Sequence, residues 1–312
     1  MDPCASFTYR VSVYCGEVND AISGIINSIL SGRCLVGRGR LETQRVKASD
    51  GAELYVEAHG EGKPIVLSCA FCTTHENWRG QIEPLVAAGR RVVLWDYRGH
   101  GLSDAPDDAS AYSIEQVVDD LRAVLDWAAP GQSAVVGGLS FGGLCSLHFA
   151  LKYPDRVEAL LLVDSGPGFK KPEAQEQWAA QVERTASFLE NRGFVDFVNG
   201  KAGATCIGTD PELPAAKAAA AAIIAQGVPG IAHFGRQVSA LAPGVIDDLA
   251  NISMRTLVLV GEFDKPFLRA AEVMASKIPD ATYEVIPGGN HIVNIETAEK
   301  FNAMVCSFLE EL

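Results

Sequence analysis

The chain has 312 residues, of which 48% are apolar and 21% are charged, and such proportions are typical of a soluble globular protein with a sizeable core. Its formal net charge of −13 disfavours binding to nucleic acid and to anionic membrane surfaces, because affinity for phosphate comes largely from Lys and Arg. Eight cysteines are too few for a disulfide scaffold in a chain of this length, so we expect reduced thiols and a cytoplasmic location.

Residues 1–40 differ in character from the rest of the chain. An apolar stretch covers residues 21–30, but polar residues interrupt it, and Glu17 and Asp20 precede it. A secretory signal favours a basic start and a cleaner apolar core, and a membrane span needs about 18–20 apolar residues. We therefore expect a loosely ordered N-terminal extension and no membrane span, and we keep secretion as the less favoured alternative.

From Leu41 onward, short β-rich runs alternate with longer helical patterns, which predicts a mainly parallel sheet flanked by helices. Residues 41–47 and 53–59 alternate apolar and polar side chains around Ser49-Asp50-Gly51 and predict an opening hairpin. Continuous apolar runs suit strands that are covered on both faces. Such runs follow at residues 65–67, 92–95, 134–136, 160–163, 256–260 and 282–286, which makes eight strands.

Helical patterns fill the intervals between these strands. Apolar stripes with a helical period occur at residues 114–125, 144–151 and 298–309. Between the sixth and seventh runs the chain looks helical from about Pro172 to Leu249, which is too long for a loop in a compact domain. The expected organisation is a core of residues 41–166 and 250–312, interrupted by a helical cap at residues 167–249.

Gly138-Leu139-Ser140-Phe141-Gly142 matches the pattern G-x-S-x-G. The motif follows a buried strand and opens an apolar helix, which is the context in which a sharp strand-to-helix turn exposes a serine hydroxyl. The flanking glycines allow the backbones to approach closely, and the helix directs its positive end towards a developing oxyanion. Ser140 is therefore the candidate nucleophile.

Three further motifs each follow a predicted strand. They are Asp96-Tyr97-Arg98-Gly99-His100-Gly101-Leu102-Ser103, Gly261-Glu262-Phe263-Asp264 and Gly288-Gly289-Asn290-His291. Together with the serine motif, they make residues 41–312 resemble the α/β-hydrolase superfamily, in particular its small capped serine esterase, lactonase and perhydrolase-like members. The resemblance implies an eight-stranded α/β-hydrolase sheet, a helical cap after the sixth strand and a Ser-His-Asp triad.

His291 follows the last strand in a Gly-rich loop, and we expect it to act as general base towards Ser140. Two aspartates are candidates for the acid that orients it. Asp264 stands in the turn that the family uses more often, after the seventh strand, and we favour it over Asp164, which ends the sixth. We expect His75 and His233 to lie at the surface.

The expected oxyanion hole consists of two backbone N–H groups, those of Phe71 and Phe141. The chain departs here from the family pattern, because Cys69-Ala70 stands where relatives usually have His-Gly. A backbone donor survives such an exchange, although alanine cannot take every conformation that is open to glycine. Candidates for the substrate pocket are Cys72, Trp178 and Phe234.

The sequence indicates neither a cofactor nor a metal. Gly137–Gly143 is Gly-rich but lacks the lysine of a phosphate-binding loop. Cys69-x-x-Cys72 has metal-ligand spacing, yet no second cysteine or histidine pair completes a zinc set.

These residues predict hydrolysis of a small to medium carboxylic ester through an acyl-enzyme. Lactone hydrolysis, carbon–carbon bond hydrolysis and cofactor-free perhydrolysis use the same residues and stay open as alternatives. A small-ligand receptor with slow or absent turnover is the alternative of another class. The expected partner is a small-molecule ester, and the sequence leaves the oligomeric state open.

Overall fold

The computed structural model describes residues 41–312, so the expected N-terminal extension lies outside the described residues. A single sheet of eight strands has the order β1-β2-β4-β3-β5-β6-β7-β8. Its strands are β1 Leu41–Lys47, β2 Glu53–His59, β3 Lys63–Ser68, β4 Arg90–Trp95, β5 Ala134–Leu139, β6 Val157–Val163, β7 Arg255–Gly261 and β8 Ala281–Ile286. Each strand predicted from the apolar runs is present.

The sheet is antiparallel at one edge and parallel elsewhere. β1 pairs with β2 from Leu41 opposite His59 to Lys47 opposite Glu53, and β2 is antiparallel to β4. All pairs from β4 through β3, β5, β6 and β7 to β8 are parallel. The carboxyl ends of these parallel strands therefore meet at one edge, where the loops that follow them can build a common site.

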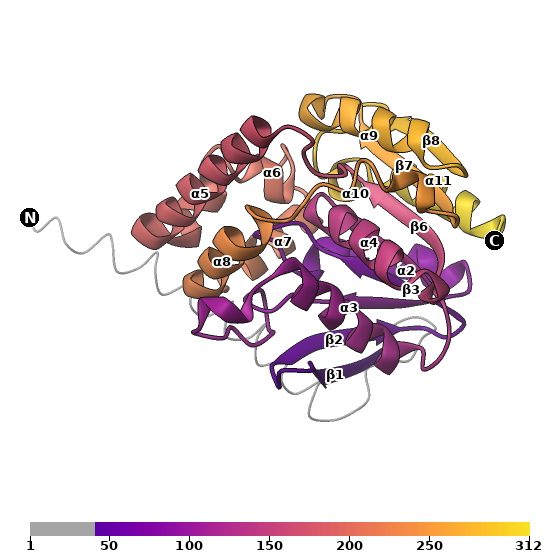
Figure 1. Cartoon of the computed structure of the whole chain (residues 1–312), viewed down its shortest axis with the longest axis horizontal. Coiled ribbons are helices and arrows are strands. Elements are labelled where there is room, and N and C mark those ends of the chain that lie inside the picture. Colours follow the sequence, from indigo (N-terminus) through magenta and orange to yellow (C-terminus); the bar gives the residue numbers. More distant parts are fainter. Residues whose placement is uncertain (1–40) are drawn as a thin grey trace, which may run out of the picture. The chain divides into compact units, whose positions relative to one another are not determined.

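Helices cover both faces of the sheet (Figure 1). The core helices are α2 Arg79–Ala87, α3 Ile114–Ala128, α4 Phe141–Lys152, α9 Lys265–Lys277, α10 Val293–Glu296 and α11 Ala298–Glu310. Apolar side chains of α3, α4 and α9 share one buried cluster, and those of α2 and α11 belong to another. The two clusters take alternate residues of one strand, as Val66 and Leu67 show, which is the consequence of a side-chain period of two.

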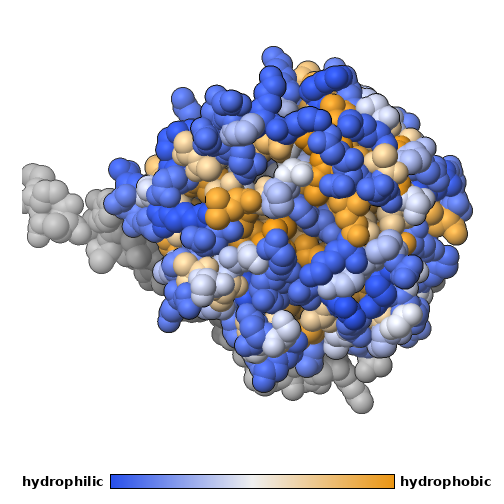
Figure 2. Space-filling model, viewed as in Figure 1, coloured by the Kyte–Doolittle hydropathy of each residue, from blue (hydrophilic) through white to orange (hydrophobic). Residues whose placement is uncertain are grey.

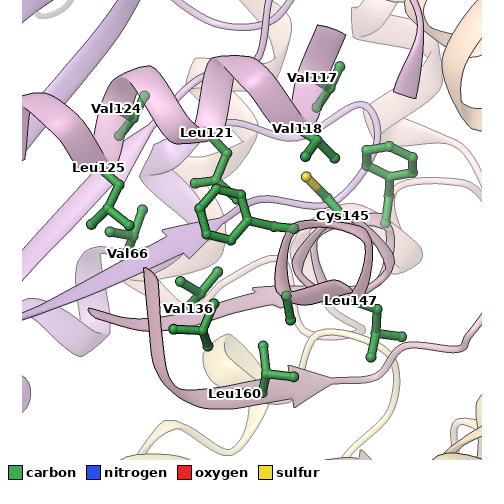
Figure 3. Close-up of a cluster of buried hydrophobic side chains, with 14 of the residues drawn as sticks. Val66, Val117, Val118, Leu121, Val124, Leu125, Val136, Cys145, Leu147 and Leu160 are labelled. Carbon is green, nitrogen blue, oxygen red and sulfur yellow. The ribbon is translucent and has the colours of Figure 1, made fainter. Parts of the chain in front are cut away.

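Figure 3 shows the first of these clusters between the sheet and two helices. Val66 and Val136 of the sheet belong to the same cluster as Leu121 of α3 and Leu147 of α4. Cys145 of α4 belongs to the same cluster and is fully buried, where a free cysteine packs as a small apolar side chain. This packing fixes α4, whose first turn carries the candidate nucleophile at its N-terminal end.

The chain between β6 and β7 is helical, as expected. This insertion, residues 167–249, contains α5 Pro172–Asn199, α6 Ala204–Ile207, α7 Pro214–Ile224, α8 Val228–Phe234 and the short π-helix η4 Gly235–Ser239. α5 bends at Gly193, whose φ is 72° and ψ is 178°. Arg236 of η4 binds Glu183 and Glu190 of α5 and joins two parts of the insertion.

One face of the molecule has a largely polar surface with separate apolar areas (Figure 2). Among residues 41–312 we find no single helix that is both long and apolar enough to cross a membrane. α7 and the stretch Val228–Ser239 pass that test only when taken together, and they are bent by 94° at the break between them.

Candidate active site

Ser140 occupies the turn between β5 and α4 in a strained backbone conformation. Its φ is 55° and its ψ is −114°, a region that residues other than glycine rarely adopt. The Ser140 N–H donates to the Val163 carbonyl at 2.8 Å, and the Ser165 hydroxyl donates to the Ser140 carbonyl at 2.6 Å. Contacts from the end of β6 therefore hold the strained residue in place.

The glycines around Ser140 are required by close backbone approaches. A Cβ at Gly138 would lie 2.4 Å from the carbonyl carbon of Gly142, and a Cβ at Gly142 would lie 2.4 Å from the Ser68 carbonyl oxygen. At such distances the backbone would have to move. The motif therefore brings the start of α4 directly against the loop after β3, where the second oxyanion donor is expected.

His291 and Asp264 form a hydrogen-bonded pair. His291 Nδ1 and Asp264 Oδ2 are 2.7 Å apart, and the Phe267 ring stacks on the imidazole with centroids 4.8 Å apart. Asp264 caps α9, and His291 lies in the loop between β8 and α10. A carboxylate on Nδ1 leaves Nε2 as the ring nitrogen that can act as a base.

The loops that carry these two residues are fastened to each other. The Phe263 N–H donates to the Gly289 carbonyl at 2.9 Å, and the Gly288 N–H donates to the Glu262 carboxylate at 2.9 Å. Because β5 and β8 run parallel in one sheet, Ser140 and His291 both follow strand ends at the same edge. The structure thus joins His291 to Asp264 and places Ser140 at the edge that the pair occupies.

Asp164, the alternative acid, is buried beneath this pair and bonds to backbone. Its carboxyl group accepts the Gly261 N–H at 2.8 Å and the Val293 N–H at 3.4 Å. Burial, and to a smaller extent the charge of Asp264, raises the pKa of Asp164 well above its usual range. Asp164 therefore ties the ends of β6 and β7 to the start of α10.

The loop after β3 forms a tight turn over residues 70–73. The Thr73 N–H donates to the Ala70 carbonyl at 3.2 Å, and Cys72 has a φ of 69°. Within residues 41–312 the N–H groups of Phe71 and Phe141 donate no hydrogen bond. Phe141 follows the candidate nucleophile directly, and Phe71 lies in the loop whose Ser68 and Cys69 carbonyls approach Gly142, so these two unused donors are suited to an oxyanion hole.

The motif Asp96–Ser103 serves as a scaffold beside this loop. Arg98 is fully buried and binds Asp120 of α3 at 2.7 Å through each of two nitrogens, and it also binds Asp50 of the hairpin turn. A Cβ at Gly101 would lie 2.1 Å from a carboxylate oxygen of Asp96, which explains the second glycine of the motif.

The expectation that His75 lies at the surface was wrong. His75 is 3% exposed, and its Nδ1 lies 2.8 Å from the Asp96 carboxylate. Burial alone would lower the pKa of His75, but the neighbouring carboxylates, Asp96 first, raise it to about 10. The apolar pattern of the sequence did not indicate that His75 is the positively charged partner of Asp96. His233, by contrast, is partly exposed and packs against the Tyr112 ring.

The three pocket candidates have different surroundings. Phe234 is fully buried and packs against Phe71 and Phe141, with ring centroids 6.1 and 5.1 Å away. Cys72 is buried in the turn, and Trp178 is partly exposed, with its indole N–H donating to the Ser239 carbonyl at 2.8 Å. A direct contact of these side chains with substrate stays a prediction.

No described cluster is suited to hold a metal ion, because residues 41–312 bring no three His, Cys, Asp or Glu side chains together in the required way. Cys69 and Cys72 are both buried, and burial raises the pKa of each thiol well above its usual range. Two residues that bond to the site were not predicted. Ser165 donates to the Ser140 carbonyl, and Gln226 donates to the Cys72 carbonyl.

A comparison with family models matches residues 63–298 to the alpha/beta hydrolase fold. A non-heme haloperoxidase of Rhodococcus erythropolis is 26% identical, over 85% of this chain and 98% of that protein. Among solved structures, an esterase from Thermogutta terrifontis is 28% identical with a TM-score of 0.75, over 87% of this chain and 98% of its own.

A lower similarity, which shows the fold alone, links the chain to the enol-lactonase of Burkholderia xenovorans LB400. The two are 24% identical with a TM-score of 0.72, and the match covers 86% of this chain and all of the other. The similar proteins thus share the architecture over nearly their whole length and differ in the reaction that their names give.

Proposed function

Because the chain belongs to the α/β-hydrolase fold family, we propose that it is a serine hydrolase that cleaves a small to medium carboxylic ester. The observation that carries this proposal is the strained Ser140, held at the start of α4 directly before Phe141, whose N–H donates no hydrogen bond within residues 41–312. Strain of this kind persists only where the surrounding structure enforces it, and it is characteristic of functional positions.

The proposed chemistry proceeds in two steps through an acyl-enzyme. Ser140 Oγ attacks the carbonyl carbon while His291 Nε2 takes its proton, and the Phe71 and Phe141 N–H groups donate to the oxyanion. His291 then passes the proton to the leaving alcohol. In the second step His291 takes a proton from water, which attacks the acyl carbon, and His291 returns this proton to Ser140 Oγ as the bond between Oγ and the acyl carbon breaks and the acid leaves.

Asp264 has an electrostatic and an orienting role in this scheme. Its carboxylate, 2.7 Å from His291 Nδ1, fixes the tautomer with the proton on Nδ1 and stabilises the imidazolium that forms in each step.

The helical insertion, residues 167–249, would act as the cap that shapes the acyl site. The free cysteines within residues 41–312 favour a cytoplasmic location.

Hydrolysis of p-nitrophenyl esters from acetate to octanoate tests the proposal. We expect turnover in the wild type and a loss on the order of 10⁶ in kcat for Ser140→Ala, with an unchanged fold. Retention of more than a tenth of the activity in Ser140→Ala would exclude the serine mechanism. Saturable binding of the esters without turnover would instead favour a receptor.

The same assay distinguishes the related reactions. A simple lactone in place of the ester tests the preference for a cyclic substrate, and addition of hydrogen peroxide tests for diversion of the acyl-enzyme to a peracid. An ester preference predicts higher kcat/KM for the open-chain substrate than for the lactone.

A further inference from the structure

Gln226 of the insertion bonds directly to the turn that carries Phe71. It lies between α7 and α8 and is 7% exposed. Its Nε2 donates to the Cys72 carbonyl at 3.0 Å, and its Oε1 accepts the Gly101 N–H at 3.0 Å. The nitrogen of the Gln226 side-chain amide thus bonds to one backbone carbonyl, and its oxygen bonds to one backbone N–H. The two bonds fix the orientation of this amide group.

The peptide group on the other side of Cys72 is also fixed by a side chain. The Cys72 N–H donates to His100 Nε2 at 3.3 Å, and His100 Nδ1 lies 3.4 Å from the Arg98 carbonyl. Burial lowers the pKa of His100 to about 4, so the ring is neutral at pH 7 and its Nε2 can accept. Both peptide planes around Cys72 are therefore held from outside the turn.

This restraint matters because Cys72 has a positive φ. A turn with positive φ at its third residue is of type II, which favours glycine or asparagine at that position because a Cβ is strained there. Without external bonds, a turn with cysteine would relax towards negative φ. Rotation about the backbone bonds of Cys72 changes the path of the preceding residues, and Phe71 is the nearest of these.

The insertion is seated firmly enough to supply such a restraint. Gly230 of α8 packs on the motif turn so closely that a Cβ there would lie 2.6 Å from the Gly99 Cα. At Gly235 a Cβ would lie 2.9 Å from Cζ of Phe71. Gln226 therefore belongs to a segment with fixed contacts both to the scaffold motif and to the Phe71 side chain.

We infer that Gln226 is a positioning residue for the oxyanion hole, which acts through the Cys72 peptide to set the direction of the Phe71 N–H. The inference rests on the proposed function, since it assigns a task within the same site. It makes the insertion part of the machinery that stabilises the transition state, in addition to any role as a cover. Loss of this restraint should lower kcat, because a misdirected donor weakens the contact with the oxyanion more than it weakens the binding of substrate.

The variants Gln226→Met and Gln226→Glu test this. Methionine keeps the length and removes the hydrogen bonds to Cys72 and Gly101, together with a longer one of 3.4 Å to the Ile223 carbonyl. Glutamate keeps the shape but turns an acceptor towards the Cys72 carbonyl. We expect kcat to fall about tenfold with KM within about twofold, less than the ~10²–10³ for complete loss of a donor. Amide hydrogen exchange over residues 69–73 should become faster. If Gln226→Met fails to fold, Gln226→Glu gives the same readouts.

A second substitution separates positioning from mere stability. Cys72→Gly adopts φ near 69° without a side-chain penalty, so Gln226→Met with Cys72→Gly should recover most of the lost kcat. Gln175→Met is the matched control, because Gln175 donates to the Ala240 carbonyl within the insertion. It should leave kcat and the exchange of residues 69–73 unchanged.

Three results would overturn the inference. They are an unchanged kcat and exchange in both Gln226 variants, an equal loss in Gln175→Met, and a double variant no better than Gln226→Met. Failure of the proposed function is seen separately, as absence of ester turnover in the wild type or its persistence in Ser140→Ala. In that case hydrogen exchange over residues 69–73 still decides whether Gln226 holds the turn.

Discussion

Asp164 and Asp264 follow neighbouring parallel strands, and Asp264 is the one whose carboxylate meets His291. Asp164 instead accepts two backbone N–H groups, from Gly261 and Val293. The two carboxyl groups therefore have separate tasks in our proposal. One stabilises charge on the imidazole, and the other holds the turns that place the first.

Exchange of each aspartate for asparagine distinguishes these tasks. Asp264→Asn should reduce kcat on the order of 10⁴-fold, because the amide no longer stabilises the imidazolium or fixes its tautomer. Asp164→Asn keeps the shape and one acceptor, and should reduce kcat less than tenfold. Steady-state kinetics on one ester measures both. A larger loss in Asp164→Asn would mean that the acid follows β6 instead.

At this scale, the sequence predicts residues that belong to local motifs. Ser140, Asp264 and His291 each stand in a short pattern after a strand, and the latter two lie within hydrogen-bonding distance of each other. Gln226 had no such signal, because it contacts Cys72 across more than 150 positions of sequence. A glutamine beside an Ala-rich helix is identified as part of the site only by three-dimensional contacts.

At the scale of elements, η1 (His75–Trp78) is joined to β2 and β4 by buried charges. His75 faces three carboxylates, with Nδ1 2.8 Å from Asp96 and Nε2 3.4 Å from Glu76 and 4.0 Å from Glu57. Arg79 of α2 adds a second positive charge on Glu57. A protonated imidazole thus balances part of the negative charge in this cluster.

The cluster predicts a particular dependence of stability on pH. Unfolded His75 loses its proton near its usual pKa of 6.5, whereas the folded protein retains it up to about pH 10. The contribution of His75 to the free energy of unfolding is fully present below pH 6.5 and is lost as the pH rises to 10. By linkage, the loss is on the order of a few kcal/mol. Urea unfolding at pH 6 to 9 should show this decline.

His75→Gln should flatten this slope, whereas His233→Gln on α8 should change it much less, because His233 is partly exposed, packs on the Tyr112 ring and forms no ion pair within residues 41–312. Equal slopes in His75→Gln and the wild type would contradict the assignment of the positive charge to His75.

Elements with a clear apolar period could be predicted, and those without one could not. All eight strands and the helices α3, α4 and α11 follow from apolar runs or stripes. α2 has no such stripe, because it buries Gln81 and Leu85 and includes Pro84. The burial of His75 depends on charges brought in by β2 and β4, which no local pattern contains.

At the scale of the whole molecule, the described residues form a sheet of eight strands. β1 begins at Leu41 and pairs along its length with β2. We therefore predict that deletion of residues 1–37 leaves a soluble protein with the same thermal midpoint and the same ester kinetics as the full chain. Differential scanning calorimetry and the ester assay check this. Aggregation of the shorter chain, or loss of its activity, would show that the first 37 residues are needed.

The contact between Gln226 and Cys72 limits how freely the two parts of this architecture can be recombined. In a chimera that carries the insertion of a relative on this core, the new helices could bring their own substrate preference. These helices would also have to supply a donor to the Cys72 carbonyl, or the core that receives them would need glycine at position 72. Evolution of new specificity by replacement of the insertion would thus depend on a second change in the core.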